Sequence, residues 1–157
     1  MVTVRRAQNK DIPRILALLL QVHLVHSKGR PDIFRSGSRK YGEEELIAIL
    51  ANEKTPVFVA VDEDGLVLGY ALCVCEEVKG DASLVDRKSI YIDDICVDEE
   101  ARGKHVGKTL YESVRAFAAE NGVYHITLNV WCLNEGAMRF YEKCGMKPLK
   151  VVMEDIL

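Results

Sequence analysis

The chain has 157 residues, of which 48% are hydrophobic and 29% charged, and this length and composition fit one compact globular domain over residues 1–157. Its 21 basic and 24 acidic residues give a formal net charge of −3, so we expect neither nucleic acid nor a membrane surface as a partner. No apolar run approaches the roughly 20 residues that cross a bilayer, and the opening residues lack the apolar segment of a signal peptide.

Five cysteines are scattered through apolar runs without a Cys-x-x-Cys pair: Cys73, Cys75, Cys96, Cys132 and Cys144. An odd number of such residues is typical of reduced thiols that pack as small hydrophobic side chains in a cytoplasmic protein. We therefore expect a cytoplasmic location and no metal site.

The first third of the chain predicts one strand and two helices. Residues 3–6 form a short strand pattern, and Asn9 or Asp11 can cap a helix whose apolar residues recur at helical spacing until about Ser27. Residues 28–42 are polar and contain three glycines, which indicates a loop. A second helix is predicted over residues 43–51.

Three consecutive strands follow, and then helix, strand, helix and strand. The strands are predicted over residues 57–61, 66–75, 89–97, 123–131 and 146–153, and the helices over residues 104–120 and 134–144. The Asp64-Gly65 turn marks a hairpin between the first two of these strands. An antiparallel hairpin beside strand–helix–strand crossovers predicts an α/β (α+β) fold, with helices flanking a mixed sheet.

The segment between residues 97 and 109 has the chemistry of a phosphate site. A buried strand ends in an acidic turn, and the turn opens an amphipathic helix. Helix N-termini offer free N–H groups and a partial positive charge to a phosphate. Arg102, Lys104 and Lys108 add cations. Gly103 and Gly107 let a pyrophosphate approach the backbone.

Two other phosphate-binding motifs do not fit this segment. Gly107-Lys108-Thr109 supplies the tail of a Walker A loop, but its leading glycine would fall at position 102, which is arginine. The three glycines of a dinucleotide-binding fingerprint are absent. An ordinary basic helix start is the structural alternative.

Two motifs carry a family resemblance. The first is Arg102-Gly103-Lys104-His105-Val106-Gly107, which is similar to the acetyl-CoA pyrophosphate loop of the GNAT family of N-acetyltransferases. His105 stands where the family usually has a glycine, which is tolerable if its backbone keeps helical φ and ψ. The second motif includes Asn134, Ala137 and Phe140-Tyr141, and it resembles the family's closing motif.

The resemblance implies a fold, a co-substrate and a binding site. The fold is a central, mostly antiparallel twisted sheet of about six or seven strands, flanked by about four helices and splayed between strands four and five. The co-substrate is acetyl-CoA, and the acceptor is an amine. The residues implied to bind acetyl-CoA lie on the edge of the fourth strand, the loop and the closing motif: Ile95, Cys96, Val97, Arg102, Gly103, Lys104, His105, Val106, Gly107, Lys108, Asn134, Ala137 and Tyr141.

Two side chains are candidates for the chemistry. By the resemblance, the Tyr141 hydroxyl protonates the leaving thiolate, and the alternative is a core aromatic at helical spacing. Asp93 and Asp94 are poor strand formers in mid-strand, and strand alternation sends them to opposite faces. We expect Asp93 in the acceptor cleft, as a base acting through water or as an attraction for an ammonium group. A bulge would exchange the two, and a surface carboxylate is the alternative.

The sequence does not identify the acceptor substrate. In the family, the loop between the first two helices often borders the acceptor site, and this region contains His23, His26, Arg30-Pro31-Asp32, Phe34 and Tyr41. The carboxylates of Glu76, Glu77 and the Asp93 pair hint at a cationic amine, such as a polyamine, an aminoglycoside, an amino acid or a protein amino terminus.

We expect direct attack in a ternary complex, because no cysteine has a recognisable neighbouring base. Transfer of another acyl group is one alternative. A non-catalytic acetyl-CoA-binding sensor on the same fold is another. The apolar final strand, with Val151 and Val152, also allows a homodimer.

Overall fold

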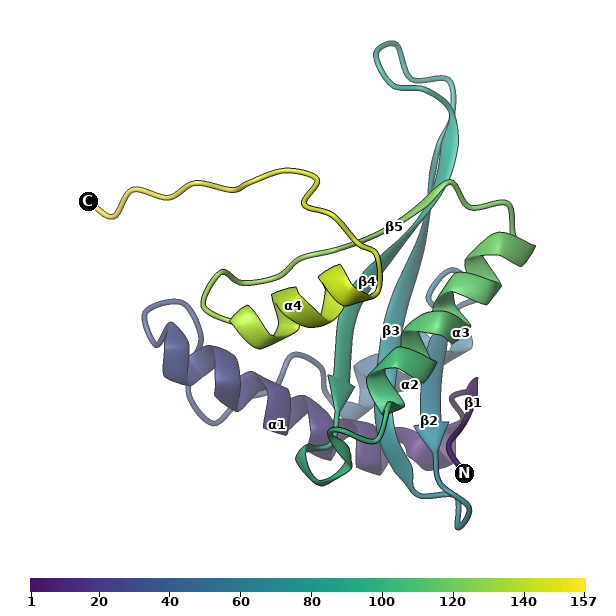
Figure 1. Cartoon of the computed structure of the whole chain (residues 1–157), viewed down its shortest axis with the longest axis vertical. Coiled ribbons are helices and arrows are strands. Elements are labelled where there is room, and N and C mark those ends of the chain that lie inside the picture. The colour runs from purple at the N-terminus through teal and green to yellow at the C-terminus, as the bar shows by residue number, and fades with distance from the viewer.

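The computed structural model describes all 157 residues and contains one five-stranded sheet and four α-helices (Figure 1). The elements are β1 (Thr3–Arg6), α1 (Ile12–Gly29), α2 (Glu43–Ala51), β2 (Val57–Val61), β3 (Val67–Val78), β4 (Arg87–Val97), α3 (Val106–Glu120), β5 (His125–Leu128) and α4 (Glu135–Lys143). Short 3₁₀ turns lie at Asn9–Asp11 and Glu99–Ala101. The strands lie side by side in chain order, and every pair is antiparallel except β4 and β5, which are parallel. The expected mixed α/β fold is confirmed.

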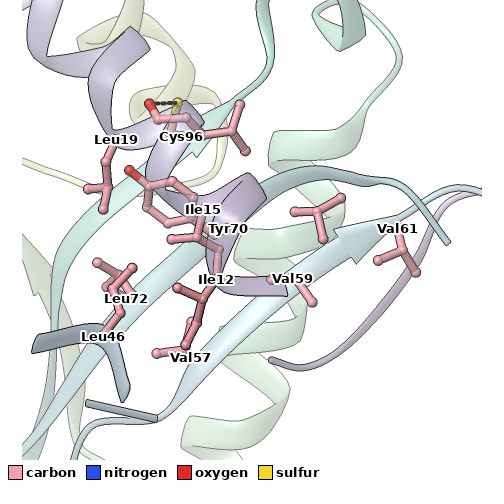
Figure 2. Packing of buried hydrophobic residues seen from close by; sticks show 12 residues of the cluster. Ile12, Ile15, Leu19, Leu46, Val57, Val59, Val61, Tyr70, Leu72 and Cys96 are labelled. Atoms are coloured by element: carbon pink, nitrogen blue, oxygen red, sulfur yellow. Dashed lines mark hydrogen bonds between the residues drawn. The ribbon is translucent and has the colours of Figure 1, made fainter. Parts of the chain in front are cut away.

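Helices cover both faces of the sheet (Figure 1). On one face, Ile12 and Ile15 of α1 and Leu46 of α2 pack with Val59 and Tyr70 of the sheet, as Figure 2 shows. On the other face, α3 supplies the apolar residues of a second cluster. Full burial of one such aliphatic or aromatic side chain stabilises the fold by about 1.5–3 kcal/mol. The two clusters hold β3 and β4 rigidly between them, and these strands carry the site described below.

β3 and β4 approach each other closely at Gly69. A Cβ atom on this residue would lie 2.6 Å from the carbonyl oxygen of Cys96 and 3.1 Å from Leu110 Cδ1. The first contact is with backbone, which cannot move aside as a flexible side chain can. Only glycine therefore fits this place between β4 and α3.

The sheet has five strands instead of the predicted six or seven, because residues 146–153 do not form a strand. Residues 147–157 make no backbone hydrogen bond. They leave the end of α4 as an extended segment that runs out past α1 (Figure 1), and we call them the C-terminal arm. Their apolar alternation is a genuine strand pattern, but a strand also needs a neighbour to pair with. This chain places none beside them.

The cysteines and helices agree with the remaining compositional expectations. All five cysteines are free, and Cys73 and Cys96 are buried. Burial raises the pKa of both thiols to about 12, which keeps them protonated and unreactive at neutral pH. None of the helices combines the length and apolar character that crossing a bilayer requires.

Candidate active site

β4 and β5 separate at the middle of the sheet. Their last paired residues are Ile92 and Leu128, yet β4 continues to Val97. Residues 94–97 pair with β3 on their other side. The edge of β4 from 93 to 97 that faces away from β3 therefore has no strand partner, and its peptide groups can bind an extended ligand. This confirms the expected splay between the fourth and fifth strands.

A tight turn leads from β4 into α3. The Asp98 carboxylate accepts a hydrogen bond of 3.2 Å from the Glu100 N–H and pairs with Arg14, which holds the acidic turn in place. His105 then adopts left-handed backbone angles, with φ 62° and ψ 11°, and α3 begins at Val106. The condition of helical φ and ψ for a side chain at His105 is therefore not met, and the helix begins two residues after the predicted residue 104. The turn needs a residue with positive φ here, which explains why the family usually has glycine.

Unpaired N–H groups and cations meet at this turn. The backbone N–H groups of Gly103, Lys104 and His105 donate no hydrogen bond within the chain, and those in the first turn of α3 have no helical acceptor. The side chains of Arg102, Lys104 and Lys108 are exposed around them. Several N–H donors, a helix N-terminus and three cations together fit the pyrophosphate of a nucleotide-like ligand.

The other residues expected to bind the donor contribute in different ways. The side chains of Cys96 and Val106 point into the core, so only their backbone groups face the site. Gly107 lies against α4, where a Cβ atom would be 3.2 Å from Phe140 Cζ. Its small size therefore allows α3 and α4 to approach, in addition to any role at the phosphates.

α4 presents the closing motif beside the free edge of β4. The Asn134 side chain caps the helix, because its Oδ1 accepts a hydrogen bond of 3.2 Å from the Ala137 N–H. This bond fixes the side chain and leaves its NH₂ group free to donate. Tyr141 is largely buried on the same helix, and that burial, together with the Asp94 charge, raises the pKa of its phenol. The hydroxyl therefore stays protonated at neutral pH.

A β-bulge in β4 decides where the two aspartates point. Leu72 pairs with Asp94 but Cys73 pairs with Ile92, so Asp93 is an extra residue without a partner in β3. Both carboxylates consequently lie on the α1–α2 face of the sheet, contrary to the expectation that alternation would send them to opposite faces.

Asp93 and Asp94 have different environments on that face. Asp93 accepts hydrogen bonds from Lys40 Nζ at 2.8 Å and from the Tyr41 hydroxyl at 2.6 Å. Asp94 accepts one of 3.0 Å from the Tyr70 hydroxyl. Burial raises the pKa of Asp94, with the Tyr70 bond opposing the effect. Asp94, and not Asp93, is the carboxylate whose charge acts on Tyr141.

Aromatic side chains form a cluster between the end of α1 and the loop after β5. The His26 and Phe34 rings are stacked with centroids 5.1 Å apart, and Trp131 meets Phe34 edge-on at 5.0 Å. His23 contacts Phe34 at 5.8 Å. Burial lowers the pKa of His26, so its imidazole stays neutral near pH 7. Through these aromatic contacts, the α1–α2 region expected to border the acceptor packs against the segment between β5 and α4.

Three residues of this region escaped the sequence analysis: Lys40, Tyr70 and Trp131. Lys40 and Tyr70 contact the aspartates across 53 and 24 residues of sequence. The loop before α2 brings Lys40 there, and the pairing of β3 with β4 brings Tyr70. Trp131 could have been noted from its place just before Asn134, since an aromatic side chain beside a binding motif often lines the site.

No group of three or more His, Cys, Asp and Glu side chains is arranged to hold a metal ion. The pairs near the site, such as Asp93 and Asp94, are already bound by Lys40, Tyr41 and Tyr70. The expectation of a metal-free protein stays a prediction.

Comparisons with known proteins agree with this geometry. The model of the acetyltransferase (GNAT) family matches residues 26–146. An uncharacterised N-acetyltransferase of Methanocaldococcus jannaschii, MJ1207, is 27% identical over 96% of this chain, which spans 62% of that relative's length. The peptidyl-lysine N-acetyltransferase YjaB of Escherichia coli is 26% identical over 93% of this chain and 82% of its own.

Solved structures show the same fold. A mutant of the BH1408 protein from Bacillus halodurans superposes with a TM-score of 0.95 at 33% identity, and the match covers 99% of both chains. The aminoglycoside acetyltransferase meta-AAC0020, from a soil metagenomic sample and in complex with sisomicin, has a TM-score of 0.73 at 18% identity, covering 99% of this chain and 96% of its own. The family match over residues 26–146, together with the splayed sheet, shows that this chain belongs to the GNAT family of acetyltransferases.

Proposed function

We propose that this protein transfers the acetyl group of acetyl-CoA to a primary amine, and that residues 1–157 act as one domain in doing so. The observation that carries the proposal is the meeting of two features: the unpaired edge of β4 ends at a turn with free N–H groups and three cations. An extended pantetheine arm fits the first feature, and a pyrophosphate fits the second.

The residues would share the work as follows. Arg102, Lys104 and Lys108 hold the phosphates, and the backbone of residues 95–97 binds the pantetheine and polarises the thioester carbonyl. Asn134 donates from its free NH₂ group to the same arm. The edge of residues 95–97 that faces away from β3 has no strand partner, and the Asn134 NH₂ group makes no hydrogen bond within the chain. The three cations are exposed at the turn.

The transfer itself needs one proton acceptor and one donor. The amine nitrogen attacks the carbonyl carbon, a C–N bond forms, and the C–S bond breaks to release a thiolate. The protonated phenol of Tyr141 supports its role as the donor to that sulfur. We retain Asp93 as a base acting through water or as an anchor for the ammonium group. Asp94 shares its face of the sheet and is the second candidate for the base.

The acceptor class rests on the relatives. One relative is a glucosamine 6-phosphate N-acetyltransferase of Arabidopsis thaliana, and another acts on peptidyl lysine. Both names describe an amino group as acceptor, which supports an amine here. The large difference between a sugar phosphate and a peptide means that family membership alone does not select the substrate. The cytoplasmic location expected from the five cysteines is proposed with it, and cell fractionation would check it.

Calorimetric titration with acetyl-CoA, CoA and desulfo-CoA tests the donor site. We expect saturable binding, weakened about tenfold or more by Arg102→Ala, because a lost charge-assisted hydrogen bond costs roughly 1.5–3 kcal/mol. Gly107→Glu should weaken it further. Lys79→Ala, which removes an exposed cation of the β3–β4 hairpin, is the matched control and should bind normally.

Folded protein that binds none of the three ligands would overturn the donor assignment. If acetyl-CoA binds, release of free thiol with a panel of amines tests the reaction. Tight binding without turnover on any amine would favour the acetyl-CoA sensor. Faster turnover with another acyl-CoA would favour the alternative donor.

A further inference from the structure

The C-terminal arm (residues 147–157) is an unusual feature for a folded chain. None of its peptide groups is hydrogen-bonded to another backbone group, and it extends away from the sheet (Figure 1). Its apolar side chains are all at least 71% exposed: Leu149, Val151, Val152, Met153, Ile156 and Leu157. When six apolar side chains are exposed on one short segment, the segment is typical of an interaction surface.

One ion pair is the only hydrogen-bonded link between the arm and the rest of its own chain. Arg30 binds Glu154 through two hydrogen bonds of 2.5 and 3.0 Å, and Arg30 is also bound to Asp32. An exposed ion pair stabilises a conformation only slightly. Fixing the backbone of each residue of an extended segment costs conformational entropy, which opposes that conformation. The extended arm therefore needs a further partner that covers its apolar side chains.

The same molecule has an edge of the sheet that lacks a partner. β5 pairs only with β4, so the peptide groups on its outer side are unpaired. Beside it lies a groove of about 540 Å³, which is bordered by α3, by β5 and by the first residues after α4. Tyr111, Ala118, Ile126 and Met146 are among the apolar residues that line it. The groove is therefore bordered by the strand whose outer edge has no partner.

The arm has the sequence of a strand with one apolar face. Leu149, Val151 and Met153 alternate with Lys150, Val152 and Glu154, and alternate residues of a strand lie on the same side. The first set can cover the groove, while Lys150 and Glu154 lie on the other face together with Val152. Pro148 is tolerated because it lies at the start of the strand, where a missing N–H costs least.

We propose that two copies of this chain exchange their arms, each arm pairing with the outer edge of β5 in the other copy. The donor must be a second copy because each arm starts at the wall of its own groove, at residues 145–147, and leaves in an extended conformation. To fill its own groove it would have to reverse direction, and this segment contains no turn. A two-fold axis makes the exchange reciprocal, so both edges and both arms are covered at once.

Light scattering coupled to gel filtration, performed over a concentration series, tests the association. We expect the full chain to be a dimer, Val151→Asp to be a folded monomer, and Val85→Asp to remain a dimer. Val85 is the matched control because it is also an exposed valine, at 80%, but lies in the β3–β4 hairpin. Removal of residues 147–157 should likewise give a monomer, and circular dichroism shows whether each variant is folded.

A photo-crosslinking amino acid at position 151 distinguishes exchange from side-by-side association. When ¹⁵N-labelled and unlabelled copies are mixed, we expect crosslinks between differently labelled peptides, joining the arm to the β5 segment around Ile126. The proposal is overturned by a full chain that stays monomeric, by a Val151→Asp dimer, or by crosslinks that form only within one copy or only to an unrelated surface. None of these results depends on acetyl-CoA.

Discussion

The hydroxyl of Tyr70 donates a hydrogen bond of 3.0 Å to Asp94 Oδ2, joining β3 to the bulged part of β4. Both side chains lie largely buried on the α1–α2 face, with Tyr70 wholly inside the first core cluster. A buried carboxylate with one hydrogen-bond donor is poorly solvated in its charged form. We therefore expect this pair to make the stability of the protein depend on pH, and its activity as well if Asp94 is the base.

The stability of the protein should fall as the pH rises through the titration of Asp94. Its pKa is raised in the folded state relative to the ordinary value of 3.8, so between these two values the folded protein binds a proton that the unfolded chain has lost. Unfolding free energy then decreases with increasing pH. Asp94→Asn should remove this decrease and be more stable than the parent above it. Urea denaturation between pH 4 and 8 measures the effect, and equal pH slopes for parent and variant would contradict it.

The two aspartates should differ in their effect on turnover. If a carboxylate is the base, its replacement by asparagine should reduce kcat/KM by about 10²–10⁴-fold. A base with a raised pKa should also place the rising limb of the pH profile above pH 3.8. Asp93→Asn and Asp94→Asn measured in parallel identify the base. Full activity in Asp93→Asn would show that Asp93 has no part in the mechanism. Full activity in both variants would show that neither carboxylate is the base, and that the amine loses its proton to water alone.

Tyr141→Phe should reduce kcat by about 100-fold or more while acetyl-CoA binding stays unchanged, since the ring and its packing remain. The pKa of Tyr141 is raised above its ordinary value of 10.0, so the parent should show no loss of activity from this group up to that pH. Steady-state kinetics and calorimetry on the same preparations check both points. Unaltered kcat in the variant would assign Tyr141 to the core alone.

His105→Gly should stabilise the protein by about 1 kcal/mol, because a left-handed conformation costs a side-chain-bearing residue about 1–2 kcal/mol and glycine's greater freedom in the unfolded chain offsets part of that. His105→Ala is the control, since it removes the imidazole but keeps the Cβ atom and the strain. Thermal unfolding of the three proteins measures the difference. Equal gains from both variants would show that the ring, and not the backbone angle, is responsible.

Gly69→Ala should destabilise the fold by about 3 kcal/mol, the upper part of the range for overpacking, because its Cβ atom would lie 2.6 Å from a backbone oxygen. Gly136→Ala in α4 is the matched control. Its Cβ atom would have only Asn134 Oδ1 within 4 Å, at 3.9 Å, and alanine favours a helix by up to about 1 kcal/mol. Opposite signs are expected in urea denaturation. A neutral Gly69→Ala would mean that β3 and β4 can separate there.

Local features of the sequence were enough to predict the helices, the hairpin and the turn before α3. Arg102, Gly103 and Lys104 lie within one turn of each other, and their chemistry needs no knowledge of distant segments. The left-handed angle of His105 was missed because residues with a side chain seldom adopt positive φ, and histidine, although enriched there, does not by itself indicate it. The contact of Asp94 with Tyr70 was missed because it depends on the register of β3 with β4. The contact of Asp93 with Lys40 was missed because it depends on the bulge and on where the loop before α2 lies.

The C-terminal arm was predicted as a strand from a pattern that is present. The pattern records which side of a segment is apolar, but it does not record whether a neighbouring strand comes from the same chain. Residues 146–153 therefore gave one strand too many for the isolated molecule.

The bulge at Asp93 also changes how the strand can tolerate insertions and deletions. Before it, Ile90 and Ile92 face α3, and after it Ile95 and Val97 face the same helix. The apolar positions thus change from even to odd numbers across a single added residue. Deleting Asp93 would restore a regular ladder and leave all four side chains on their present face. Adding or losing one residue earlier in β4, with the bulge kept, would turn the rest of the strand over and send Asp94 towards the core beneath α3.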